Sequence, residues 1–165
     1  YITRDELIGQ MPMMGKRYPD YKSYSEATLK DIFGTSELEG VNRLEANHLA
    51  TSLFERSANG KFVLKQLPLE AQTSPIYALI ALDYDKDGKK DLLLCGNQLR
   101  TRLRLGQYDA NFGTLLHNNG NGNFSYVPQQ KSGFHLNGEV RSILNVNDKL
   151  YFGINQQKIV AYGIR

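Results

Sequence analysis

The stretch that decides the fold is a nine-residue run rich in aspartate: Asp83-Tyr84-Asp85-Lys86-Asp87-Gly88-Lys89-Lys90-Asp91. Aspartates occupy its positions 1, 3, 5 and 9, and glycine occupies position 6. Hard cations such as Ca²⁺ take about six to eight oxygen ligands, several of them carboxylates. Alternate carboxylates on a tightly turned loop converge on one point, and Gly88 permits the sharp turn because it has no Cβ. The run therefore predicts a cation-binding loop.

We predict that the loop binds one Ca²⁺ through the side chains of Asp83, Asp85, Asp87 and Asp91 and the backbone carbonyl of Lys89. Without a cation these four like charges would repel one another. The alternative is an ordinary turn, because Asp and Gly are common turn residues. A turn needs only one or two such residues, so five of them in register favour the metal site.

Short apolar segments flank the loop on both sides, Ile76–Leu82 before it and Leu92–Cys95 after it. They are rich in strand-forming residues and are bounded by Pro75 and by Gly96-Asn97, which indicates two buried β-strands. An EF-hand would require flanking helices and a glutamate at position 12, where this chain has Leu94. The loop is therefore predicted to join two strands.

A strand, the pattern D-x-D-x-D-G-x-x-D and a second strand resemble the repeat unit of the FG-GAP (VCBS-type) family. This resemblance implies β-propeller blades with a calcium loop between the first two strands of a blade. The stretch from Arg4–Leu7 through Asp31–Phe33, with Gly106–Ala110 later in the chain, resembles a bacterial branch related to the cartilage acidic protein and UnbV group. Proteins of that branch are expected at the cell surface.

Internal repeats agree with a blade architecture. Residues 51–62 align without gaps on residues 113–124, and both segments read as a strand, an Asn-Gly turn and a strand that starts at Phe. A second repeat relates residues 76–97 to residues 140–155. In the later copy Asn147-Asp148-Lys149 replaces the aspartate loop, so a single metal site is predicted.

The predicted fold class is mainly β: antiparallel β-propeller blades that form a partial propeller of about two to three blades, with a short N-terminal helical insertion. The chain is interpreted as one partial-propeller unit of residues 1–165. It comprises a helical insertion (1–40), the outer hairpin of a blade (43–68), a four-stranded blade with the calcium loop (75–128) and a three-stranded final blade (139–165). Propellers have about four to eight blades, so we expect a C-terminal fragment of a longer protein that self-associates through its open edges.

Two capping boxes predict two short helices in the first third of the chain. Thr3 is followed by Glu6, and Ser23 is followed by Glu26. An apolar stripe of Leu29, Ile32 and Phe33 follows the second box, and Gly34 is expected to stop that helix.

Composition excludes several classes of function. A net charge of +3 is too small to indicate nucleic-acid binding, and no apolar run approaches the ~20 residues of a membrane span.

Cys95 is expected to be a buried hydrophobic residue. The histidines lack the spacing of zinc ligands and are expected at the surface or in hydrogen bonds: His48, His117 and His135.

The predicted function is a non-catalytic calcium-binding module that binds a protein or a glycan. Extracellular calcium modules bind at ~10⁻⁴ to 10⁻³ M, so an extracytoplasmic location is expected: periplasmic, secreted or cell-surface. The alternative is part of a polysaccharide lyase or hydrolase whose active site lies in upstream blades. Other polar residues carry weaker hypotheses: an anionic-ligand stripe at Arg100, Arg102 and Arg104 if they lie in a strand, and acid pairs among Asp5, Glu6, Asp20, Asp109 and Glu139.

Overall fold

The computed structural model describes residues 2–164, which form two compact units that divide between Asn47 and His48. The first described unit contains four short α-helices and a 3-10 turn: α1 (Arg4–Gln10), α2 (Met14–Arg17), α3 (Tyr21–Ser25), α4 (Leu29–Ile32) and η1 (Thr35–Glu37). The second unit carries all the strands among the described residues. The predicted mainly β class is therefore confirmed. Membership of both units in one propeller stays a prediction.

The first helix begins where its capping box predicts. Thr3 caps α1: the Glu6 N–H donates to its hydroxyl, and its own N–H donates to the Glu6 carboxylate at 2.9 Å. The helices bury a small apolar core of their own, made of Leu7, Met14, Tyr18 and Ile32. This core explains why the segment is compact by itself.

The prediction of a single second helix capped by Ser23 is wrong. Asp20 caps α3 instead, because its carboxylate accepts the Ser23 N–H at 2.8 Å and leaves Ser23 inside the helix. A further helix, α4, starts after Thr28, whose capping box uses Asp31 as the acid. Ile32 of the predicted apolar stripe is buried, whereas Leu29 is exposed.

In the described part of the second unit, residues 48–164, the strands form three antiparallel sheets in sequence order. The first sheet is a hairpin of β1 (Ser52–Arg56) and β2 (Phe62–Gln66). The second has four strands in the order β3 (Ile76–Leu82), β4 (Asp91–Gly96), β5 (Thr114–Gly120) and β6 (Asn123–Val127). The third has three strands in the order β7 (Val140–Val146), β8 (Lys149–Ile154) and β9 (Val160–Gly163). Short helical segments lie in the connections between strands: η2 (Leu69–Ala71) before β3, η3 (Leu103–Leu105) between β4 and β5, and α5 (Gln129–Ser132) before β7. The strands β3 and β4 lie where the apolar runs Ile76–Leu82 and Leu92–Cys95 predict them.

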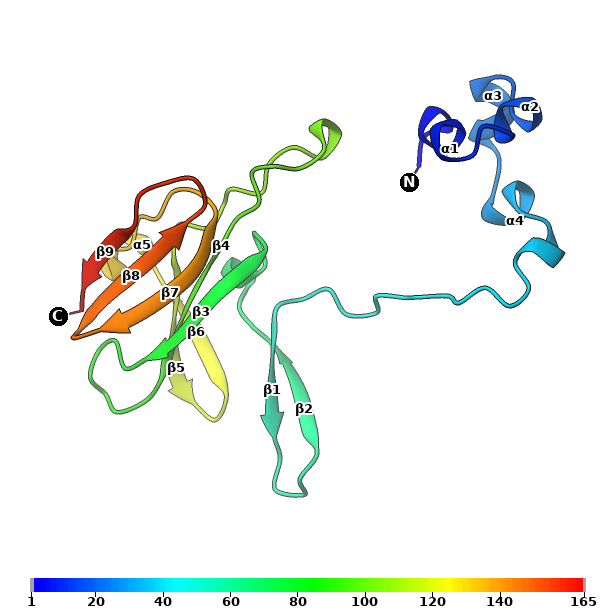
Figure 1. The fold of residues 1–165 in the computed structure, drawn as a ribbon. Coiled ribbons are helices and arrows are strands. Elements are labelled where there is room, and N and C mark those ends of the chain that lie inside the picture. Colours follow the sequence, from blue (N-terminus) through cyan, green and yellow to red (C-terminus); the bar gives the residue numbers. More distant parts are fainter. Residues whose placement is uncertain (1, 165) are drawn as a thin grey trace. The chain divides into compact units, whose positions relative to one another are not determined.

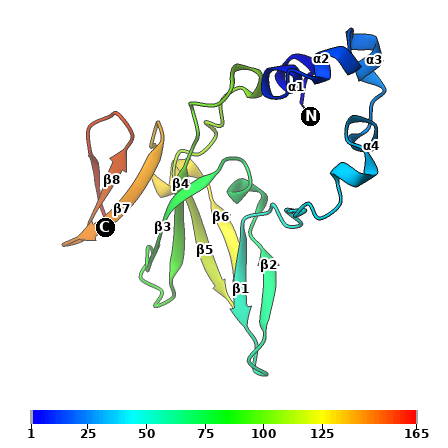
Figure 2. The same ribbon diagram turned by 45° about the vertical axis from the view of Figure 1, so that its right-hand side comes forward.

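The four-stranded sheet lies between the other two, as both views show (Figure 1 and Figure 2). Successive side chains of a strand point to opposite faces of its sheet. Leu93 and Cys95 accordingly pack with Phe152 of the three-stranded sheet, whereas Leu94 and Leu116 pack towards the β1–β2 side. This two-sided burial explains why β4 reads as a continuous apolar run rather than an alternating one. Burial also raises the pKa of the Cys95 thiol to about 12, so Cys95 is a core residue, as predicted.

A buried polar junction joins the four-stranded sheet to the sheet that follows it. The Asn97 amide donates to the carbonyls of Asn111 and Gly138 at 2.7 and 3.1 Å, and its oxygen accepts from Ser74 Oγ and the Asn111 N–H. Asn97 is only 1% exposed and has a positive φ of 82°, which asparagine tolerates better than most residues. Because Gly138 leads into β7, this one side chain bridges two sheets.

The first strands of these two sheets, β3 and β7, also meet through Arg141. Its guanidinium lies 3.9 Å from the centre of the Tyr77 ring, and it donates to the Asn97 carbonyl at 2.9 Å. Such a cation–π contact stabilises by about 0.5–2 kcal/mol, depending on solvent access. Arg141 therefore holds the sheets together.

An insertion of residues 98–112 lies between β4 and β5. A bridge between Gln98 and Tyr108 closes it. The arginines at 100, 102 and 104 lie in this loop and in η3 rather than in a strand, so the alternation that would place them on one face does not apply.

Candidate metal centre

The aspartate run forms the connection between β3 and β4, as predicted. Leu82 pairs with Asp91 at the end of the hairpin, so residues 83–90 form the loop between them. Gly88 has a φ of 86°, and Lys86 has a φ of 63°. The positive φ at Gly88 confirms the conformational reason for a glycine at this position.

Three of the predicted ligands gather in this loop. Asp83, Asp85 and Asp87 each offer a carboxylate oxygen such that the three atoms lie within 4.8 Å of one another. Backbone N–H groups orient these side chains: Gly88 donates to Asp83 at 3.0 Å, and Lys89 donates to Asp87 at 2.8 Å. Backbone donors cannot move without unfolding the turn, so the carboxylates are held together before any ion binds.

The second oxygen of Asp83 shows that the loop suits a cation. Asp83 Oδ1 is buried and has no hydrogen-bond partner among the described residues. A buried carboxylate oxygen without a partner is costly, since water no longer solvates its charge. An ion bound among the three carboxylates would compensate that charge. The donor set is anionic oxygen throughout, which hard cations prefer.

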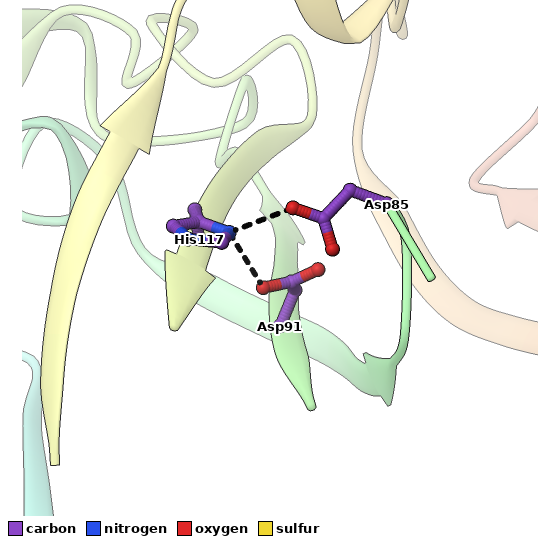
Figure 3. A group of neighbouring side chains, drawn as sticks. All are labelled: Asp85, Asp91 and His117. Carbon is purple, nitrogen blue, oxygen red and sulfur yellow. Dashed lines mark ion pairs between the residues drawn. The ribbon is translucent and has the colours of Figure 1, made fainter. Parts of the chain in front are cut away.

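Asp91 is placed differently from the other three aspartates. Its side chain is 2% exposed and accepts two backbone hydrogen bonds, from Tyr84 N–H at 3.0 Å and Asn118 N–H at 2.8 Å. It forms a second potential metal-binding group with Asp85 and His117 (Figure 3). Asp85 thus belongs to both groups. The roles of Asp91 and the Lys89 carbonyl as calcium ligands remain predictions.

A lysine partly neutralises the loop. The Lys89 ammonium donates to Asp87 at 2.6 Å. This hydrogen bond lowers the pKa of the Asp87 carboxyl and, together with the charge of Asp87, raises the pKa of Lys89. Both side chains are partly exposed, so the pair contributes little to folding and can separate when an ion binds.

The sequence-based prediction missed His117 as a neighbour of the centre. Its ring nitrogen Nδ1 lies 3.2 Å from Asp85 Oδ2 and 3.3 Å from Asp91 Oδ1. The sheet register could have revealed this proximity, because Leu92 pairs with Leu116 and the next position places Asp91 opposite His117. The sequence predicts both strands but not the pairing between them.

Three of the five acids considered for glycosidase chemistry, Glu6, Asp20 and Glu139, have structural roles. Glu6 and Asp20 cap helices in the first unit. Glu139 accepts from the Asn155 amide at 2.7 Å and from the Leu99 N–H at 2.8 Å, and these bonds lower the pKa of its carboxyl. The carboxylates that the structure gathers are instead those of the aspartate loop.

No protein-family model, curated protein or solved structure matches this chain. Among the described residues, no helix combines the length and the apolar character that a membrane span requires.

Proposed function

We propose that this chain is a calcium-binding part of an FG-GAP/VCBS-type β-propeller, a non-catalytic module that binds a protein or a glycan outside the cytoplasm. The observation that carries the proposal is the gathered trio of Asp83, Asp85 and Asp87 with the buried, unpartnered Asp83 Oδ1. The sheet hairpin fixes this trio at the end of two core strands. A cation bound there stabilises the fold and needs no catalytic role.

Calcium fits this site better than magnesium does. We expect Asp83, Asp85, Asp87, Asp91 and the Lys89 carbonyl as ligands at ~2.3–2.6 Å from Ca²⁺. Mg²⁺ requires a near-ideal octahedral shell at ~2.0–2.1 Å and tends to keep several waters. A flexible shell suits a loop whose carboxylates have partners of their own, as Asp87 has in Lys89.

Three features of the second unit support the propeller proposal. The sheets stack in sequence order, and the middle one is a four-stranded meander, the unit from which propellers are built. The first hairpins of the last two sheets both shift register at corresponding positions, between Ile76 and Ala78 and between Val140 and Ser142. The β1–β2 hairpin also leaves Phe54 and Phe62 exposed, an apolar surface of the kind on which a further sheet would stack.

Calcium should raise the stability of this chain, and chelation should lower it. With a Kd of about 0.1 mM and 1 mM free calcium, binding adds roughly 1.4 kcal/mol to the free energy of unfolding. Thermal melts with calcium and with EDTA test this, beside calorimetric titration. Asp85→Asn should abolish the calcium response. Asp148→Asn, in the corresponding turn between β7 and β8, should leave it intact. A melting curve that EDTA does not change, despite calorimetric proof of bound calcium, would contradict a structural role.

The protein should lie outside the cytoplasm. Simple extracellular calcium modules bind at ~10⁻⁴ to 10⁻³ M, which matches extracytoplasmic calcium levels and not cytosolic ones. Cell fractionation with a cytosolic marker as control measures the location. Recovery of the protein with the cytosolic marker would refute this part of the proposal.

A further inference from the structure

A nitrogen donor stands beside the predicted calcium ligands. His117 on β5 directs Nδ1 towards Asp85 of the loop and Asp91 at the start of β4 (Figure 3). Its nitrogen lies 3.2 and 3.3 Å from one oxygen of each carboxylate. Three ligand atoms from three segments of the chain thus surround one point.

The two nitrogen–oxygen separations match the shell of a transition metal, and all three ligand atoms lie within 4.8 Å of one another. Around an ion with bonds of ~2.0–2.1 Å and tetrahedral angles, neighbouring ligand atoms lie about 3.3 Å apart. A charge-assisted hydrogen bond from imidazolium to carboxylate is shorter, about 2.7–2.9 Å. The His117 nitrogen is nearly equidistant from both oxygens and forms such a short bond with neither. This arrangement fits an ion among the three atoms better than it fits an ion pair.

The position is preorganised on one side and open on the other. Asp91 is fixed by the N–H groups of Tyr84 and Asn118, so its oxygen needs no rearrangement to bind. The side chains of His117 and Asp85 are 30% and 43% exposed, which leaves room for water or an external group to complete the shell. On the other side of the shared Asp85, the buried oxygen of Asp83 is unpartnered, so the centre has negative charge left to compensate.

We propose that His117, Asp85 and Asp91 form a second cation position, which takes a borderline divalent transition metal such as Zn²⁺ or Co²⁺. Imidazole nitrogen suits these ions, whereas Ca²⁺ prefers oxygen alone. Asp85 is shared with the calcium trio, so it bridges the two positions when both are filled. Asp91 is also an expected calcium ligand, so the proposal rests on the proposed calcium function through Asp85 and Asp91, and His117 is the residue that belongs to the second position alone.

Titration of the chain with Co²⁺ tests the proposal, because tetrahedral coordination gives Co²⁺ a much stronger visible absorption band than the octahedral hydrated ion has. We expect a 1:1 band in the absence of calcium. His117→Gln should weaken Co²⁺ binding more than about tenfold, since losing even an outer-shell partner costs about 10–100-fold. Its calcium affinity should stay unchanged. Asp87→Asn should show the reverse: weaker calcium binding and an unchanged cobalt band.

Two further variants complete the test. His135→Gln, an exposed histidine remote from the aspartate loop in sequence, is the matched control and should keep the cobalt band. Asp85→Asn should weaken the binding of both Co²⁺ and Ca²⁺. This variant tests the shared ligand independently if His117→Gln lowers the melting temperature. An unaltered cobalt band in His117→Gln would overturn the second position. Equal losses of cobalt and calcium in that variant would also overturn it, because they would indicate one mixed site. An unaltered chain that gives the cobalt band but binds no calcium would count against the proposed function and not against the second position.

Discussion

Asn97→Leu should lower the free energy of unfolding by about 4 kcal/mol or more. Leucine has a similar shape, but it leaves the Asn111 N–H and carbonyl buried, and the Gly138 carbonyl partly buried, without their side-chain partner. Each such group costs about 1–3 kcal/mol. The φ of 82° adds strain for a residue that lacks the local hydrogen bonding of asparagine. Urea denaturation monitored by circular dichroism measures the loss.

Asn121→Leu separates these two contributions. Asn121 also has a positive φ, 54°, but it lies exposed in the turn between β5 and β6. This control should lose only about 1–2 kcal/mol, the cost of the left-handed backbone. A similar loss in both variants would mean that the buried junction contributes little and that Asn97 serves only its backbone conformation.

Phe152→Ala should cost about 3–5 kcal/mol, the usual range for a fully buried phenylalanine. The Phe152 ring is 0% exposed and makes edge contacts with Phe134 and Tyr162. It lies in the core between the three-stranded and four-stranded sheets, so its removal leaves a cavity at that interface. The free energy of unfolding from chemical denaturation, with calcium held constant, is the measurement.

Leu144→Ala is the matched control for Phe152→Ala. Leu144 lies on the neighbouring strand β7 but is 61% exposed, so its truncation should change stability by less than about 0.5 kcal/mol. If both variants lose equal stability, Leu144 is covered in solution, which would indicate that this face of β7 packs against another surface.

The sequence predicts most of the second unit because its signals are local. The apolar runs at 76–82 and 92–95 give β3 and β4, and the Asn-Gly turns give the hairpins. Gly88 and the alternating aspartates give the loop and its trio of carboxylates. Each of these features depends on residues within one turn or one strand, and no competing tertiary contact overrides them.

The remaining features depend on contacts between distant segments. His117 reaches Asp91 only through the pairing of β4 with β5 across the 98–112 insertion. The junction at Asn97 requires Gly138, 41 residues away. The start of α3 was missed for a local reason: Asp20 and Ser23 both resemble caps, and the Asp20 carboxylate that accepts the Ser23 N–H decides between them. Sequence patterns identify candidate residues for such caps and contacts, but they do not predict which candidate makes the contact in the fold.

The position of the aspartate loop on the middle sheet has a consequence for cooperativity. β4 carries Leu93 towards one hydrophobic core and Leu94 towards the other, and the loop fixes the end of this strand. An ion that tightens the loop therefore restrains the strand that both cores share. The two interfaces should melt together in a single transition whose midpoint follows the metal concentration, so that a small surface loop governs the integrity of the whole stack.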